Sequence, residues 1–585
     1  MIASSTRGTE ADAGARPWLV AALGLFLIGA GLLAWRTPMF EAPDENSHAE
    51  YAGLVLARQR LPLVLGTAEQ TGEPRWAQAA LGHHPPLYYA VLASILRIGG
   101  ARDLQVHVES TPKGSATRFM HGIDELEPTR TVWWLRLLRG FSVLCGLISL
   151  LAIHGILREL APSSPRVAAL GVFVLATNGG WLRTHAVLDN GNLALTLTFV
   201  VLWILARAMR RGTLSNLTAV GLGLIAAAAL WTKLTAIVCP GAIGLALLLG
   251  VRSRKPEAGD GVRSSAALEW RLALALVIAV GLWTPWILRN LDLYGEPLAT
   301  AVHQQAYAAS VLPGEVRWQH LLRGFPAGLY KTALGPIGWN GPLVPIWLQA
   351  GSWMLLALVA IGFVRRSSRP RIEPRAAWMV LGVGVAALLL VVRFNSVFVQ
   401  PQARYALAAA PVVALFIGSG LSAWTGGPSI GSVRRGAASA VAAIGLGLWG
   451  GFLVVHETSF SETIDGSRRR TIATIDLDVA PLDPHLPPPV ISTWAGATPR
   501  IDWTSDGSQG AVAQWSVALW VEGGPRFGGT FESLGLSVES GSFDVPPVVW
   551  DYLESGDELS VCVRELASSG AAVAVAKSAV AQIRR

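Results

Sequence analysis

The segment Pro43-Asp44-Glu45-Asn46-Ser47-His48 holds the residue types best suited to chemistry. Two adjacent carboxylates can act as a general base with an orienting partner, or they can ligate a divalent cation. Asp44 and His48 are four residues apart, so they share one face if the segment is a short helix. The alternative is a surface helix that Asp44 merely caps, and the segment alone does not separate the two interpretations.

A second segment, His83-His84-Pro85-Pro86-Leu87-Tyr88-Tyr89, leads into an apolar and aromatic stretch. Its two prolines favour an extended approach to that stretch. Tyrosine suits a membrane interface, so interfacial anchoring is the better interpretation of Tyr88 and Tyr89. The two histidines, so close to the membrane plane, are harder to explain in this way, although a hydrogen-bonded structural role is more common than catalysis for such residues.

Further polar residues stand at the ends of apolar runs. Each has a plain structural explanation, because cations near helix ends snorkel and an aspartate caps a helix N-terminus. Together, however, three separated cations and several acids project on one face, whereas the ion sites of transporters lie at mid-membrane. A cationic cluster at a leaflet suits a lipid-linked phosphate, and a carboxylate beside it can deprotonate an acceptor hydroxyl. These residues are Asp189, Asn190, Lys233, Arg289, Arg404 and Tyr405.

The composition predicts that membrane helices position these residues. Of 585 residues, 52% are hydrophobic and only 15% are charged, and the mean hydropathy is +0.44. These values exclude a disordered or fibrous chain and disfavour an ordinary soluble enzyme. The three cysteines have no metal-ligand spacing, and the basic excess lacks the aromatic interleaving of a nucleic-acid-binding surface.

Long apolar runs predict an α-helical polytopic membrane protein with about eleven transmembrane helices. The first run is too long for a signal-peptide core, so it is expected to be retained. Arginine clusters between the later runs all fall on one side, which the positive-inside rule makes the cytoplasm. Counting Pro85–Ile98 as a span would place these clusters outside, so that run is predicted to lie along the membrane surface. The eleven runs are 17–35, 132–157, 166–184, 189–206, 216–232, 234–251, 271–288, 344–364, 376–393, 403–424 and 437–455.

The domain organisation follows from this topology. Residues 1–16 are predicted to form a cytoplasmic tail, and 17–456 a multi-pass domain with outer loops 36–131 and 289–343. Residues 457–585 carry nine Lys/Arg and seventeen Asp/Glu, whereas the first 456 residues have a net charge of +16. This acidic part alternates apolar and polar residues in short runs, which predicts an all-β, sandwich-like extracytoplasmic domain.

In this order, the motifs resemble the GT-C class of polyprenyl-phosphate-dependent membrane glycosyltransferases. Bacterial members related to protein O-mannosyltransferases and lipid A aminoarabinose transferases are the most similar, and the resemblance covers about residues 17–424. It is carried by Asp44-Glu45 with His48, His84-Pro85-Pro86-Leu87-Tyr88-Tyr89, Arg136-Leu137-Leu138, Asp189-Asn190, Arg289-Asn290 with Tyr294-Gly295-Glu296-Pro297, and Ala403-Arg404-Tyr405.

The resemblance implies Asp44 as the catalytic base, with Glu45 completing the motif. It also implies His84 on the acceptor side or at a metal. A divalent cation, Mg²⁺ or Mn²⁺, held by Asp44, Glu45 and His84 is the one cofactor suggested. Its requirement stays open, because the chain lacks the additional acidic pair of metal-dependent oligosaccharyltransferases. Basic contacts to the donor phosphate are expected from Lys233, Arg289 and Arg404, and acceptor or other site contacts from His48, His84, Tyr88, Asp189, Asn190 and Tyr405.

The expected function is inverting transfer of a sugar from a polyprenyl-phosphate donor to an extracytoplasmic glycan, lipid or protein, at a bacterial inner membrane. The alternatives are a ligase of lipid-linked polymers, a transporter or flippase of envelope lipids, and a non-catalytic envelope assembly protein. A transporter predicts inverted repeats and broken helices with polar groups at mid-bilayer, and neither is clear in the sequence. A catalytic role for Asp44 separates the enzymes from the assembly protein.

Overall fold

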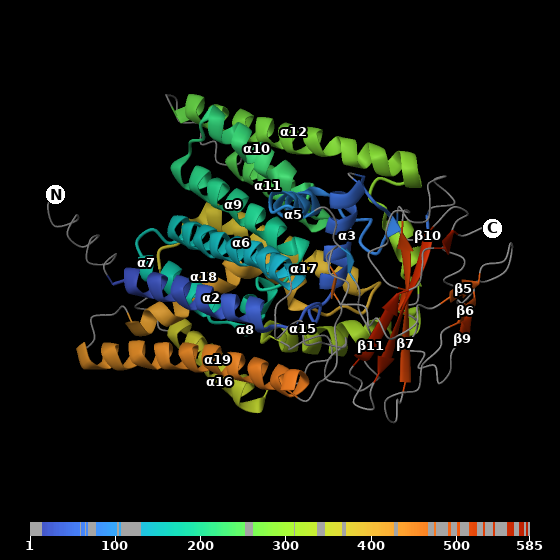
Figure 1. Cartoon of the computed structure of the whole chain (residues 1–585). Helices are drawn as coiled ribbons and strands as arrows, with labels where there is room; N and C mark the ends of the chain where they lie inside the picture. The colour runs from blue at the N-terminus through green and yellow to red at the C-terminus, as the bar shows by residue number, and fades with distance from the viewer. Residues whose placement is uncertain are drawn as a thin grey trace.

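The chain folds into a bundle of long helices with strands gathered at one end (Figure 1). A computed structural model describes residues 14–465, and beyond residue 465 it describes strands alone. Within 14–465 the description leaves out residues 59, 65, 68–77, 102–104, 107–129, 252–260, 309–310, 336–344, 365–369 and 426–430.

Eight of the described helices are long and apolar enough to cross a membrane. A helix satisfies its own backbone hydrogen bonds, which lipid cannot do, and this is why these apolar runs become helices. The eight coincide with eight of the predicted runs. They are α2 (Arg16–Arg36), α6 (Arg130–Leu160), α9 (Asn190–Arg211), α12 (Gly261–Tyr294), α16 (Ile346–Val364), α17 (Pro374–Asn395), α18 (Ala410–Thr425) with the preceding 3-10 helix η8 (Ala403–Ala409), and α19 (Gly431–Asp465).

The other three predicted runs form shorter apolar helices: α7 (Pro165–Ala176), α10 (Asn216–Leu230), and η3 (Leu234–Ile237) continued by α11 (Val238–Val251). The run 166–184 is not one helix, because Asn178 caps a separate helix α8 (Gly179–Thr184). Its side-chain oxygen accepts a hydrogen bond from the Trp181 N–H at 2.9 Å. Eight of the described helices are therefore long enough to span a membrane, and the total of eleven transmembrane helices stays a prediction.

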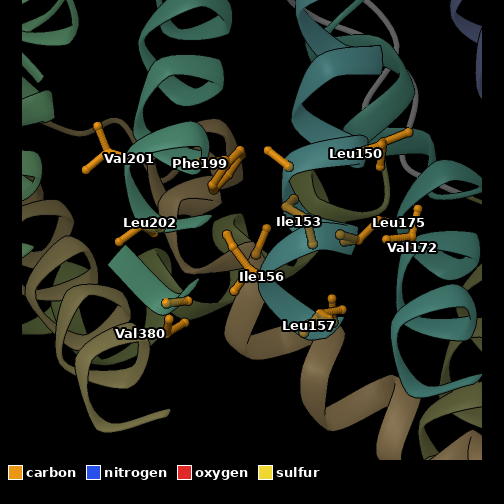
Figure 2. Packing of buried hydrophobic residues seen from close by; sticks show 14 of the residues in the cluster. Leu150, Ile153, Ile156, Leu157, Val172, Leu175, Phe199, Val201, Leu202 and Val380 are labelled. Carbon is orange, nitrogen blue, oxygen red and sulfur yellow. The ribbon is translucent and has the colours of Figure 1, made fainter. Parts of the chain in front are cut away.

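The core of the bundle forms where α6 packs between α7 and α9. Glycines let α7 and α18 approach closely, because a Cβ at Gly418 would lie 2.0 Å from the Val167 carbonyl oxygen. Small residues commonly permit such contacts between membrane helices. Figure 2 shows Leu150, Ile153, Ile156 and Leu157 of α6 among Val172 and Leu175 of α7, Phe199 and Leu202 of α9, and Val380 of α17.

The segment between α2 and α6, predicted to be the first outer loop, builds a second, smaller core at one end of the bundle. It contains α3 (Glu45–Arg58) and α5 (Leu87–Ile98), with β1 (Leu63–Val64) parallel to β2 (Gln78–Ala79). Three tyrosines pack there against α6 and are fully buried: Tyr51, Tyr88 and Tyr89. Helix α5 has 12 residues and is not among the eight helices long enough to cross a membrane, and its placement along the membrane surface stays a prediction.

The segment between α12 and α16, predicted to be the second outer loop, crosses the same end of the bundle. An isolated bridge between Val311 and Phe398 ties it to the segment after α17. Its elements are α13 (Thr300–Ala306), η5 (Gly314–Val316), α14 (Arg317–Gln319), the π-helical turn η6 (His320–Gly324) and α15 (Phe325–Ala333).

The tail begins later than predicted, because α19 continues to Asp465. Beyond it, the described residues form two sheets, in the orders β11-β10-β7-β8 with β12 beside β10, and β5-β6-β9. A sandwich-like domain stays a prediction. The strands are β5 (Val490–Ser492), β6 (Arg500–Asp502), β7 (Gln514–Glu522), β8 (Phe531–Glu532), β9 (Ser542–Asp544), β10 (Glu558–Leu566), β11 (Ala572–Lys577) and β12 (Ala581–Gln582).

One further strand pair joins the segment between α2 and α6 to the tail. Strand β3 (Gln105–Val106) pairs antiparallel with β4 (Ala473–Thr474), which follows α19. Both segments therefore lie at the same end of the bundle.

Candidate active site

The chain leaves α2 through a tight loop in which two residues have left-handed backbone conformations. Phe40 has φ 66° and Asp44 has φ 65°. Such angles strain most side chains, and Asn and Asp tolerate them best. Contacts from other parts of the chain must therefore stabilise the loop in this conformation.

Arg139 of α6 provides such contacts, and it is completely buried. Its Nε donates to Glu45 Oε1 at 2.8 Å, and its Nη2 donates to Glu45 Oε2 at 2.7 Å. Its remaining N–H groups donate to three backbone carbonyls at the end of α2 and the start of the loop. A bidentate arginine–carboxylate pair of this kind fixes both position and orientation. The three carbonyls belong to Ala34, Thr37 and Pro38.

Glu45 has no remaining capacity for chemistry in this arrangement. It is 1% exposed, and besides Arg139 it accepts hydrogen bonds from the backbone N–H groups of Phe40 and Leu188, both at 3.0 Å. The two adjacent carboxylates therefore have different environments, since Glu45 is enclosed while the Asp44 side chain is 32% exposed.

Asp44 belongs to a charge cluster of two carboxylates and two cations, which come from four separate parts of the chain. Arg404 Nη2 donates to Asp44 Oδ2, and Arg404 Nη1 donates to Asp189 Oδ2 at 2.9 Å and to the Pro43 carbonyl at 3.2 Å. Lys233 Nζ donates to the other oxygen of Asp189 at 3.2 Å. The structure thus joins four of the residues predicted from sequence, and their charges sum to zero.

Asp189 is the centre of this cluster. It caps α9, where its side chain accepts a hydrogen bond from the Gly191 N–H at 2.6 Å. A Cβ at Gly191 would lie 2.9 Å from Asp189 Oδ1, so only glycine leaves this capping geometry undisturbed. Burial by itself raises the pKa of Asp189, but Lys233 and Arg404 outweigh it and hold the pKa well below its usual range. Asp189 is therefore an anchor for cations rather than a proton acceptor near neutral pH.

His48 lies behind the cluster, with its Nε2 4.0 Å from Asp189 Oδ1. Its Nδ1 is 3.1 Å from the Tyr89 hydroxyl, and its ring stacks on the Tyr89 ring. Burial lowers the pKa of His48 to about 4, so it is neutral at pH 7 and adds no charge. Tyr88 is fully buried beside it, at 6.0 Å between ring centroids.

Tyr405 and Asn190 form hydrogen bonds with residues in and next to the charge cluster. The Tyr405 hydroxyl accepts a hydrogen bond from Arg404 Nη2 at 3.0 Å and donates to Gln400 Oε1 at 2.7 Å. Asn190 Nδ2 donates to the Thr232 carbonyl at 3.3 Å, next to Lys233.

A group of histidines lies next to His48. The His84 ring centroid is 6.4 Å from that of His48 and 4.1 Å from that of His83, which in turn is 3.9 Å from that of His303. Burial keeps the pKa of both His83 and His84 well below its ordinary value. No group of three His, Cys, Asp or Glu among the described residues has the geometry of a metal site.

The three predicted metal ligands are not brought together as a set. Asp44 and Glu45 each face an arginine instead, and His84 packs among imidazole rings. The residues present therefore do not fit a divalent cation, and the steps proposed below do not pass through one.

Arg289 is separated from the cluster. It donates to Asn290 Oδ1 at 3.3 Å and to the Pro62 carbonyl at 3.1 Å, and it lies 4.8 Å from the Trp286 ring centroid. None of these contacts involves Asp44 or Asp189, so the predicted trio of cations divides into a pair, Lys233 with Arg404, and one outlier.

Comparison with known proteins gives structural matches alone: no protein-family model and no curated protein matches the chain. The chain is similar to ArnT from Cupriavidus metallidurans bound to undecaprenyl phosphate, at 16% identity over 76% of this chain and 77% of that one, with a TM-score of 0.43. It is also similar to the Archaeoglobus fulgidus oligosaccharyltransferase AglB in complex with an inhibitory peptide and a dolichol-phosphate, at 13% identity, 75% and 56% coverage and a TM-score of 0.41.

A third match is the S. cerevisiae protein O-mannosyltransferase Pmt1-Pmt2 complex bound to the sugar donor, at 14% identity, 52% and 36% coverage and a TM-score of 0.32. AglB and Pmt1-Pmt2 are named as glycosyl-transferring enzymes, the class that the sequence resembles. All these TM-scores lie below 0.5, so the proposals below rest on the residues of this chain.

Proposed function

We propose that this protein is a membrane glycosyltransferase that moves a sugar from a polyprenyl-phosphate donor to an acceptor hydroxyl, with Asp44 as general base. The observation that supports this most directly is the partly exposed carboxylate of Asp44 at the end of a membrane bundle, paired with Arg404, which shares Asp189 with Lys233. A lipid-linked phosphate reaches such a place from the bilayer, and an acceptor reaches it from water.

In the proposed reaction, Asp44 accepts the proton of the acceptor hydroxyl, and the hydroxyl oxygen forms a bond to the anomeric carbon of the sugar. The bond between that carbon and the phosphate oxygen breaks, and the lipid phosphate leaves with the electron pair. Lys233 and Arg404 stabilise the charge that develops on this leaving group. Because the two events occur on opposite faces of the sugar, a single displacement inverts the anomeric centre.

The orientation proposed for this site is away from the cytoplasm of a bacterial inner membrane. Asp189 caps the start of α9, while Arg210 and Arg211 lie in its last turn, 22 residues later. A helix of that length covers about 33 Å, so the acidic and basic ends lie at opposite membrane surfaces. The positive-inside rule then assigns the arginine end to the cytoplasm.

This orientation predicts the outcome of cysteine labelling. In a variant lacking the native cysteines, Ser110→Cys and Ser508→Cys are expected to react with an impermeant maleimide in cells whose outer membrane is permeabilised. Thr213→Cys, which follows the arginine end of α9, is expected to react only after lysis. Protection of Ser110→Cys and Ser508→Cys in intact cells would reverse the topology and remove the extracytoplasmic assignment.

The donor phosphate is expected to depend on Lys233 and Arg404 more than on Arg289. Loss of one charge-assisted contact costs about 1.5–3 kcal/mol, so Lys233→Ala and Arg404→Ala should weaken binding of polyprenyl phosphate roughly ten- to hundredfold. Arg289→Ala is the matched control, because its contacts lie elsewhere. Binding of radiolabelled polyprenyl phosphate to purified protein measures all three, and unchanged affinity in the first two variants contradicts the phosphate role.

The activity itself is tested by incubating purified protein with a panel of radiolabelled polyprenyl-phosphate sugars. Release of free lipid phosphate by one member of the panel supports the proposal and identifies the sugar. A protein that binds these donors without ever releasing phosphate, with any acceptor fraction added, would instead be a transporter or an assembly protein.

A further inference from the structure

The segment Arg317–Ala333, made of α14, η6 and α15, lies across the ends of membrane helices. His320 Nε2 is 3.4 Å from Asn395 Oδ1, at the last residue of α17. The Tyr330 ring is 5.4 Å from the ring of Trp353, two turns inside α16. Contact with a helix terminus and with a side chain just inside a span places this segment at the depth of the lipid headgroups.

The outer surface of this segment combines apolar and basic side chains. Trp318 is 70% exposed and Leu322 is 73% exposed, and the two lie four residues apart. Tryptophan favours the membrane interface, and an apolar surface flanked by basic side chains is typical of segments that lie in it. Basic residues on the same segment complement anionic headgroups. The exposed basic residues are Arg317, Arg323 and Lys331.

The inner surface of the segment contacts the residues at the start of η8, the 3-10 helix that contains Arg404. We refer to residues 400–406 as the Arg404 turn. Thr332 Oγ1 accepts a hydrogen bond from the Ala403 N–H at 2.8 Å, one residue before Arg404. A Cβ at Gly328 would lie 2.5 Å from Pro401 Cγ, so helix and turn are in direct contact. Because this contact is direct, a displacement of the segment would also displace the backbone at Arg404.

We propose that Arg317–Ala333 binds the bilayer surface through anionic phospholipid headgroups, and from there holds the Arg404 turn in position. Trp318 and Leu322 enter the upper acyl region, while the basic side chains remain at the phosphates. The significance of the Arg404 turn rests on the function proposed above, but the binding to the bilayer does not.

Depth measurement by spin labelling tests the bilayer contact. Trp318→Cys, Leu322→Cys and, as control, Gln319→Cys are each introduced into the full chain lacking Cys145, Cys239 and Cys562, and reconstituted in nanodiscs of phosphatidylcholine with phosphatidylglycerol. The first two labels should collide more with oxygen than with a water-soluble nickel chelate, and Gln319→Cys should show the reverse. Preferential collision with nickel at 318 and 322 means exposure to water, and protection from both reagents means a protein contact. Either result overturns the proposal.

The choice of headgroup is tested in the same discs. With phosphatidylglycerol present, the oxygen-to-nickel ratio at Trp318→Cys should rise relative to phosphatidylcholine alone, and Arg317→Gln with Arg323→Gln should abolish the rise. A ratio independent of phosphatidylglycerol contradicts the anionic partner.

The link to Arg404 is tested by hydrogen exchange, which needs no catalysis. Thr332→Val removes the acceptor of the Ala403 N–H, and the amides of residues 400–406 should exchange at least about fivefold faster. Thr300→Val, in the same loop, is the matched control and should leave them unchanged. Trp318→Ser with Leu322→Ser should also accelerate these amides in nanodiscs if the bilayer holds the segment. Unchanged exchange in that variant removes the link, and this holds whether or not the protein proves to be a glycosyltransferase.

Discussion

Asp44→Asn is expected to yield a folded protein that still binds polyprenyl phosphate but turns over about 10²–10⁴-fold more slowly. Asparagine keeps the size of the side chain and tolerates the left-handed backbone at this position, but it does not accept a proton near neutral pH. The measurement is release of lipid phosphate at saturating donor, together with donor affinity. Asp292→Asn, an exposed acid on α12, is the matched control and should retain full activity.

The substitution also separates a base from a helix cap. Asparagine caps a helix about as well as aspartate, so a capping role predicts normal activity. In the structure, the Asp44 carboxylate pairs with Arg404. Near-normal transfer by Asp44→Asn contradicts the proposed mechanism.

Arg139→Gln is expected to have the largest effect on stability. It leaves Glu45 buried with neither its counter-charge nor two of its hydrogen bonds, and breaking a buried ion pair in this way typically costs about 3–5 kcal/mol. Thermal unfolding in detergent measures the loss, and Arg393→Gln, at an exposed site on α17, is the control. Activity should fall with stability, because the loop that carries Asp44 loses its attachment to α6.

A double variant distinguishes an uncompensated charge from general damage. Arg139→Leu with Glu45→Leu removes both charges, so its melting temperature should lie above that of Arg139→Gln, while its activity should remain low. Glu45→Gln keeps the side-chain shape and should reduce turnover less than Asp44→Asn does. A double variant less stable than the single one would mean that the hydrogen bonds of Arg139 and Glu45 to the surrounding backbone contribute more than the charge interaction.

The sequence predicted the components of the site better than their pairing. Asp189, Lys233 and Arg404 stand out as charged residues at the ends of apolar runs, which made them candidates. Their separations of 44 and 215 residues carry no information about which groups meet. For the same reason Arg289 was grouped with the other cations, although it binds the Pro62 carbonyl instead.

Arg139 was not among the predicted site residues. It lies inside the run 132–157, whereas the predicted cations stand at the ends of such runs. A charged residue within an otherwise apolar run was the available signal, because such a residue needs a buried partner. The break after Ala176 was also missed, since Thr177 and Asn178 are weak helix breakers and the capping bond of Asn178 becomes apparent only in three dimensions.

The internal neutralisation of the charge cluster has a consequence for the proposed catalytic cycle. Lys233 and Arg404 already hold Asp44 and Asp189 as counter-ions, so an arriving phosphate must compete with two tethered carboxylates. Breaking these ion pairs offsets part of the attraction between the phosphate and the two cations. In the proposed reaction this limits how tightly a lipid phosphate binds. After transfer in the proposed reaction, Asp189 is in place to recapture the cations at once, and Asp44 can do so after it has released the proton that it accepted. The protein's own carboxylates would then compete with the spent carrier for these cations, so the cluster would favour departure of the product as well as arrival of the donor.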